Sequence, residues 1–162
     1  MEILLFMVVA TIAVISAMVV LLHKNPVIGA LFLAGNLVCI ALLYLLLDAQ
    51  FLAAIQVIVY AGAIMVLILF VIMLLNLRRE EGVQAGSAQR SIATIAGTAF
   101  VMLLVLGILP VSRRAATVRA DFGTAEYIGR RLFSDYFYPF EMISLVLLVA
   151  MAGAVVLAKK KL

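Results

Sequence analysis

The sequence has little of the side-chain chemistry from which metal and redox centres are built. Its 162 residues include one cysteine and one histidine, and 12% of them are charged. A single cysteine, Cys39, excludes a disulfide within the chain and any iron–sulfur or metal site that needs several thiolates. With only one histidine as well, we expect no haem or metal centre built from this chain alone, and we interpret Cys39 as a small packing residue.

The shortage of charge accompanies an excess of apolar residues, which make up 68% of the chain. Soluble domains are about 45–50% apolar and about 25% charged. Apolar runs of 18 or more residues, wound as helices, cross a hydrocarbon core that is roughly 30 Å thick. The composition therefore predicts an all-α integral membrane protein.

Five apolar runs predict five membrane spans in a single membrane domain, residues 1–162. We expect the spans at about 3–22, 27–47, 53–77, 92–111 and 140–158. The first run opens with Met1-Glu2 and lacks a following cleavage pattern, so we interpret it as a retained span and not as a signal peptide. Asn25 before Pro26 predicts a capped start of the second span, and residues 48–51 should form a polar turn before the third. The first three spans, tightly joined, should act as one antiparallel block.

The distribution of basic residues predicts the orientation in the membrane. Seven lie on short segments of one side: Lys24, Arg78, Arg79, Arg90 and the three lysines near the C-terminus. Five arginines lie on the other side, mostly in one long loop. The positive-inside rule then places the N-terminus outside and the C-terminus in the cytoplasm. Membrane topology also explains the net charge of +4 better than nucleic-acid binding does.

The long loop, residues 112–139, contains one amphipathic segment. A short helix is expected at about residues 125–133, with Ile128, Leu132 and Phe133 on the bilayer surface. Arg130 and Arg131 should then face water. The aromatic residues at 136–140 are typical of an interfacial belt.

Ionisable residues inside membrane spans usually mark ion or proton pathways. In this sequence the predicted spans have none in their interiors, because all eight acidic residues fall at span ends or in loops. We therefore expect that the chain does not move ions alone and has no catalytic residues of its own. The acidic residues are Glu2, Asp48, Glu80, Glu81, Asp121, Glu126, Asp135 and Glu141.

Polar or small residues do occur within the spans, and helix packing explains most of them. Asn36, beside Gly35, is interpreted as a structural residue that bonds between helices. Tyr60 is harder to explain in this way. It should lie about 12 Å into the third span, near the midplane, whereas membrane tyrosines usually sit at the interface.

The surroundings of Tyr60 leave two interpretations open. Helical spacing places Gln56 on the same face, together with the small residues Ala53 and Ala63. Either this face simply packs against another helix, or the helix loosens near Gly62 into a wide π-type turn, a feature that often marks functional sites.

A family resemblance bears on this choice. Residues 24–77 closely resemble the second and third spans of subunit J, or chain 6, of proton-translocating NADH-quinone oxidoreductases (respiratory complex I). The run VIVYAGAIMVLILFVIMLLN within them is very specific to that family. The segment IGRRLFSDYFYPFEMISLVLLVAMAGAVVLA, residues 128–158, is similar to the last loop and fifth span of that family. The likeness is weak over the first span, the fourth span and residues 78–125.

The resemblance implies a five-span accessory subunit of a bacterial plasma-membrane complex. Its partners would be the quinone-site subunit, small carboxylate-bearing subunits and antiporter-like subunits. NADH or another donor, FMN, iron–sulfur clusters and quinone would be held by other subunits.

The resemblance also implies a π-bulge near Tyr60 that converts toward α-helix as the enzyme changes state. Residues 60–66 would be a bistable element. The residues of the π-bulge region that the resemblance implies in conformational coupling are Gln56, Tyr60, Ala61, Gly62, Ala63 and Val66. Glu80 and Glu81 match a region where the family often carries an acid, and here they are interpreted as solvated charges.

Other functions remain open at this point. Similar spans occur in ferredoxin-linked, hydrogenase and cation-antiporter complexes, and the chain could also be a structural scaffold. A stand-alone transporter is disfavoured because the spans lack internal charges.

Overall fold

The structure is a computed structural model that describes residues 1–75, 87–108 and 121–159. It divides into two compact units, Met1–Asn76 with Ala120–Leu162, and Leu77–Arg119. The prediction of a single membrane domain is not tested by this division.

Every regular element among the described residues is helical. The first unit contains α1 (Glu2–Leu22), α2 (Pro26–Leu46), α3 (Gln50–Ile55), η1 (Gln56–Ile64), α4 (Met65–Leu75), α6 (Ala125–Ser134) and α7 (Phe137–Ala158), and the second contains α5 (Ser87–Ile108). Within the described ranges, four helices are long and apolar enough to cross a membrane: α1, α2, the combined helix Gln50–Leu75, and α7. The predicted all-α membrane class is therefore confirmed. The apolar part of α5 is shorter, Ser91–Leu104.

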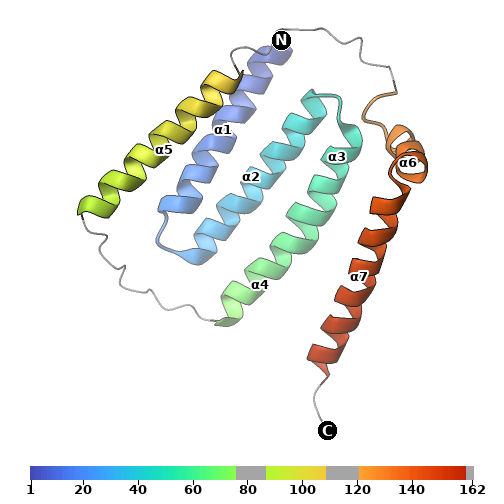
Figure 1. The fold of residues 1–162 in the computed structure, drawn as a ribbon. Helices are drawn as coiled ribbons and strands as arrows, with labels where there is room; N and C mark the ends of the chain where they lie inside the picture. The colour runs from blue at the N-terminus through green and yellow to red at the C-terminus, as the bar shows by residue number, and fades with distance from the viewer. Residues whose placement is uncertain (76–86, 109–120, 160–162) are drawn as a thin grey trace. The chain divides into compact units, whose positions relative to one another are not determined.

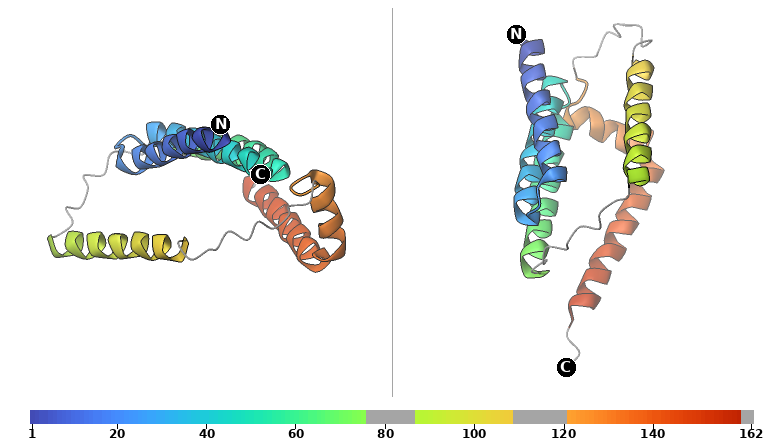
Figure 2. Two further views of the ribbon diagram at one scale, coloured as in Figure 1. Left: turned by 90° about the horizontal axis from the view of Figure 1, so that it is seen from above. Right: turned by 90° about the vertical axis from the view of Figure 1, so that its left-hand side faces the viewer.

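The three N-terminal spans lie side by side in one row, as predicted for a tightly joined block (Figure 1, Figure 2). Helix α2 is the middle member, because it packs against α1 and also against α3, η1 and α4. The buried positions are mostly small, among them Ala30 and Ala41 of α2 and Ala53 of α3. Small residues let the helix backbones approach closely, which is how helices associate in lipid.

Two polar side chains join α1 to α2 across this contact. The Ser16 hydroxyl of α1 donates to the Phe32 carbonyl at 2.6 Å, and the Asn36 amide of α2 donates to the Ala13 carbonyl at 2.8 Å. Each helix thus donates one hydrogen bond to a backbone carbonyl of the other. Both side chains are buried, so the two bonds fix the register of the pair.

We expect the double variant Ser16→Ala, Asn36→Leu to weaken the α1–α2 pair modestly. Interhelical hydrogen bonds in membranes contribute about 0.6 kcal/mol each on average, and about 1.7 kcal/mol at most. A small fall in the thermal stability of the purified complex should follow. Thr11→Val is the matched control, since the Thr11 hydroxyl donates to the Met7 carbonyl of its own helix at 2.7 Å. If the double variant and the control are equally stable, the Ser16 and Asn36 hydrogen bonds do not stabilise the α1–α2 pair.

The start of α2 is capped as predicted. The Asn25 side chain accepts a hydrogen bond from the Val27 amide at 3.0 Å, with Pro26 at the first helical position. This arrangement gives a partner to one of the unpaired amides at the start of α2, and it sets where the α1–α2 loop ends and the helix begins.

Three predicted span starts differ from the structure by a few residues. Helix α5 begins at Ser87 instead of about 92. The third span begins at Gln50 instead of about 53, because the Phe51 amide in its first turn donates to the Gly123 carbonyl at 2.9 Å. The last span begins at Phe137 and not near 140. Pro139 then lies in the first turn, where a missing amide hydrogen costs little.

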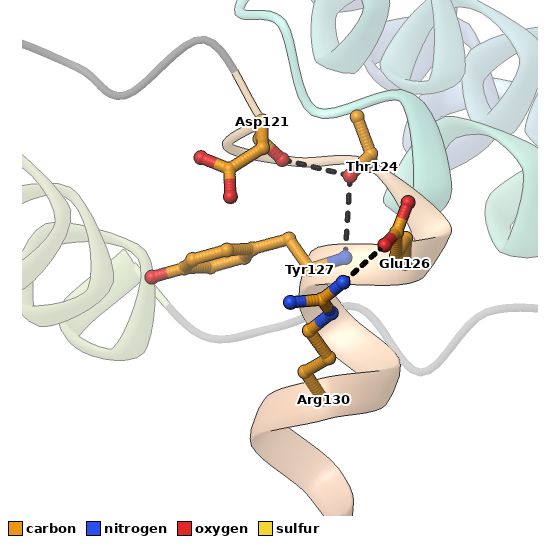
Figure 3. A network of polar contacts seen from close by, with 5 residues as sticks. All are labelled: Asp121, Thr124, Glu126, Tyr127 and Arg130. Carbon is orange, nitrogen blue, oxygen red and sulfur yellow. Dashed lines mark hydrogen bonds and ion pairs between the residues drawn. The ribbon is translucent and has the colours of Figure 1, made fainter.

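Helix α6 matches the predicted amphipathic segment. Thr124 caps it by accepting from the Tyr127 amide at 3.2 Å, and Arg130 pairs with Glu126 at 2.6 Å (Figure 3). Arg131 pairs with Asp135. A hydrogen bond with Tyr127, together with Asp135, raises the pKa of Arg131, so this exposed arginine stays cationic.

Candidate coupling segment in the third span

The middle of the third span is wound more widely than an α-helix. Residues Gln56–Ile64 form a π-helix between the α-helical segments α3 and α4. At its end the Met65 amide donates to the carbonyls of Tyr60 and Gly62. Tyr60 is five residues before Met65, which is the π spacing, whereas an α-helix pairs residues four apart.

The extra residue is visible in the burial pattern of the span. Inward positions are Ala53, Gln56, Ala61, Met65 and Leu69, all buried or half-buried. The step from Gln56 to Ala61 is five residues, whereas the other steps are three or four. The π segment therefore adds one residue between two correctly placed halves and keeps both halves facing α2.

The predicted common face of Gln56 and Tyr60 was wrong. Gln56 is 8% exposed, whereas Tyr60 is 49% exposed. Ala63 is exposed as well, although Ala53 is buried. The prediction assumed α-helical spacing throughout, and the wide turn places Ala61 inward where an α-helix would place Tyr60.

Gly62 lies where the π winding brings backbone atoms close together. A methyl group added at its Cα would sit 3.2 Å from the carbonyl oxygen of Val57, five residues earlier. Few real Cβ atoms approach a neighbour that closely, so a larger residue would require the Val57 carbonyl to shift by a few tenths of an ångström. The glycine suits the wide winding because it adds no atom at this point.

The other predicted site residues are placed as follows. Ala61 is half-buried, and Val66 lies in α4, outside the π segment, with its side chain exposed. Asn36 is the interhelical donor described above. Glu80 and Glu81 lie outside the described residues. Within the described ranges, no group of three or more His, Cys, Asp or Glu side chains could hold a metal ion.

Comparison with known proteins places this segment in a family. The model of the NADH-ubiquinone/plastoquinone oxidoreductase chain 6 family matches residues 16–157. The chain belongs to this family. The predicted membership is confirmed, and the match includes the first-span end, fourth span and middle loop where the sequence likeness had been weak.

Three relatives of this chain 6 family member are subunits of NAD(P)H-quinone oxidoreductases. NAD(P)H-quinone oxidoreductase subunit 6 of the Paulinella chromatophora organellar chromatophore is 42% identical over 92% of this chain and 74% of its own length. Chain 6 of the enzyme from Synechocystis sp. is 37% identical over 97% of this chain and 80% of its own. The chloroplastic subunit 6 of Chlorokybus atmophyticus is 39% identical over 91% and 78%.

Sequence reasoning about this chain 6 protein missed two structural residues near the segment. Met65, at the first position of α4, is 1% exposed and ends the π winding through its amide. Gly123 contacts the start of the third span from far along the chain. A glycine directly before a capping threonine was the available signal for a turn at Gly123, but it does not indicate what the turn contacts.

Proposed function

We propose that this chain is a non-catalytic membrane-arm subunit of an NAD(P)H-quinone oxidoreductase, in which a change in the winding of η1 couples quinone reduction to proton translocation. Family membership supports a place in this complex, and one observation supports the change in winding. The π-wound segment lies in the middle of a span that has no charged residue from Gln50 to Leu75.

A conversion of η1 to α-helix would change one backbone hydrogen bond and the residue that faces α2. The Met65 amide would leave the Tyr60 carbonyl and pair with Ala61, four residues earlier. With the step from Gln56 shortened to four, the Tyr60 ring would take the inward position that Ala61 holds now. A large hydroxyl-bearing side chain would thereby move from the outer surface of the row to the α2 side, and water could enter or leave the space it vacates.

Protons and electrons would be carried by neighbouring subunits in this scheme. The expected partners are the quinone-site subunit, the small carboxylate-bearing subunits and the antiporter-like subunits. NADH or another donor, FMN, iron–sulfur clusters and quinone would be bound by other chains. This chain would contribute a change of shape, consistent with the many large apolar side chains exposed on the described part of the row.

The topology favours a fifth span. Residues 50–75 extend about 39 Å at 1.5 Å per residue, yet Gly123 contacts Phe51 at the beginning of that helix. This contact supports a return crossing between α4 and α6, and α5 is the described helix within that stretch. We propose that α5 makes this crossing, with the N-terminus outside and the C-terminus in the cytoplasm of a plasma membrane.

Tyr60→Phe tests the coupling role. If the hydroxyl bonds a neighbouring subunit in one state, its loss shifts the balance between states, and a hydrogen bond that contributes about 1 kcal/mol corresponds to roughly a fivefold change. We expect normal assembly on native gels with about fivefold lower proton pumping in membrane vesicles.

Tyr138→Phe is the matched control, because Tyr138 is also an exposed tyrosine of a helix long enough to cross the membrane but lies at the start of that helix, α7. It should leave pumping unchanged. If Tyr60→Phe assembles and pumps like the control, the hydroxyl has no part in coupling and the subunit is better described as a scaffold.

A further inference from the structure

The turn that precedes α6 is joined to the first turn of the third span. Gly123 lies buried in this turn, and its carbonyl accepts the hydrogen bond from the Phe51 amide at 2.9 Å. Phe51 is near the beginning of α3, where helix amides have no partner within the helix. A residue from the C-terminal part of the chain thus completes the start of the helix that contains η1.

The contact tolerates only glycine. Gly123 has a φ of +79°, which other residues rarely adopt. A Cβ at this position would lie 2.1 Å from the Asp48 carbonyl oxygen and 3.0 Å from the Ala49 Cα. Both are backbone atoms of the α2–α3 turn, so no side-chain rotation relieves the clash. Asp48 itself has a φ of 58°, so two left-handed residues meet here.

The turn is held in place from its other side by α6. The Thr124 hydroxyl donates to the Asp121 carbonyl at 2.7 Å and accepts from the Tyr127 amide, which ties the turn to the first turn of α6 (Figure 3). Helix α6 in turn contacts α7, where Phe133 and Phe140 pack edge-to-face with ring centroids 5.1 Å apart. The turn that contains Gly123 is therefore held by α6, which itself packs against α7.

We propose that Gly123 is a positioning residue that clamps the start of the third span, so that a change of winding in η1 rotates α4 and leaves α3 fixed. The inference rests on the proposed function. Changing the number of residues per turn rotates one end of a helix relative to the other. The clamped end begins at Phe51, and η1 starts five residues later at Gln56. Gly123 acts through Phe51 and touches no reacting group.

Hydrogen exchange of the intact wild-type complex tests the clamp directly. Amides of residues 50–55 should exchange at the same rate at rest and during turnover with NAD(P)H and quinone, whereas those of residues 56–65 should change. Equal changes in both segments would overturn the clamp but leave the winding change standing. No change in residues 56–65 would instead contradict the proposed function.

Gly123→Ala supplies the second test, with Gly129→Ala as its control. Gly129 lies in α6, and a Cβ there meets nothing within 4 Å. In complexes that assemble, we expect Gly123→Ala to speed exchange of residues 50–55 at least about fivefold, the effect of losing one hydrogen bond, and to lower the number of protons pumped per electron.

Gly129→Ala should change neither quantity. Faster exchange at residues 50–55 with an unchanged proton-to-electron ratio would overturn the positioning role. Unchanged exchange in Gly123→Ala would overturn the clamp itself. If the Gly123→Ala complex does not assemble, hydrogen exchange of the wild-type complex at rest and during turnover decides whether Gly123 clamps the start of the third span.

Discussion

Gly62→Leu is expected to reduce quinone-dependent proton pumping by about tenfold or more, the factor that corresponds to about 1.4 kcal/mol. The added Cβ would lie 3.2 Å from the Val57 carbonyl oxygen, and the leucine branches would extend the overlap. Because the contact joins residues five apart, it belongs to the π winding, and the substitution should disfavour that state. The measurement is pumping and quinone reduction in membranes, with assembly checked by native gel.

Two further variants make this result specific. Gly62→Ala places only the Cβ against Val57 and should give an intermediate loss. Gly153→Leu introduces the same side chain in α7, where a Cβ meets nothing within 4 Å, and should pump normally. Normal pumping by an assembled Gly62→Leu complex would show that the wide turn is dispensable.

Met65→Ala is expected to have the largest effect on stability. Met65 is 1% exposed and is the one large side chain that is fully buried among the described residues. Truncating a buried methionine costs about 2–5 kcal/mol, and the lost atoms lie directly beside the end of η1. We expect little assembled complex on native gels and a clearly lowered unfolding temperature in what remains.

Met73→Ala is the control for this prediction. Met73 belongs to the same helix, α4, but is 68% exposed, so its truncation leaves no internal cavity. Both variants should be expressed from the native operon to keep partner subunits at normal levels. If they accumulate and unfold alike, packing at the π–α junction does not stabilise the third span.

Most of the fold follows from local sequence. The apolar runs are long enough to cross a bilayer, and this fixes the spans with little regard to tertiary contacts. Asn25 with Pro26 marks a helix start through a bond that spans two residues. The charge pattern of residues 125–133 predicts an amphipathic helix for the same local reason. Asn36 donates a hydrogen bond between helices, as its place in an apolar span indicated. Its acceptor, the Ala13 carbonyl, could not be predicted from the sequence.

The side-chain directions in the third span could not be predicted in this way. Helical periodicity assigns faces only while the winding is constant, and one added residue at residues 56–64 turns Tyr60 outward and Ala61 inward. The contact between Gly123 and Phe51 could not be predicted from the sequence for a different reason. It depends on two backbone conformations at distant positions, and neither leaves a periodic signal.

The winding change in η1 can be observed by high-resolution electron cryomicroscopy of the intact complex, at rest and during turnover with NAD(P)H and quinone. We expect the Met65 amide to pair with the Tyr60 carbonyl in one state and with the Ala61 carbonyl in the other, and the Tyr60 ring to move toward α2. The same π winding over Gln56–Ile64 in every state, with Tyr60 unmoved, would contradict the winding change.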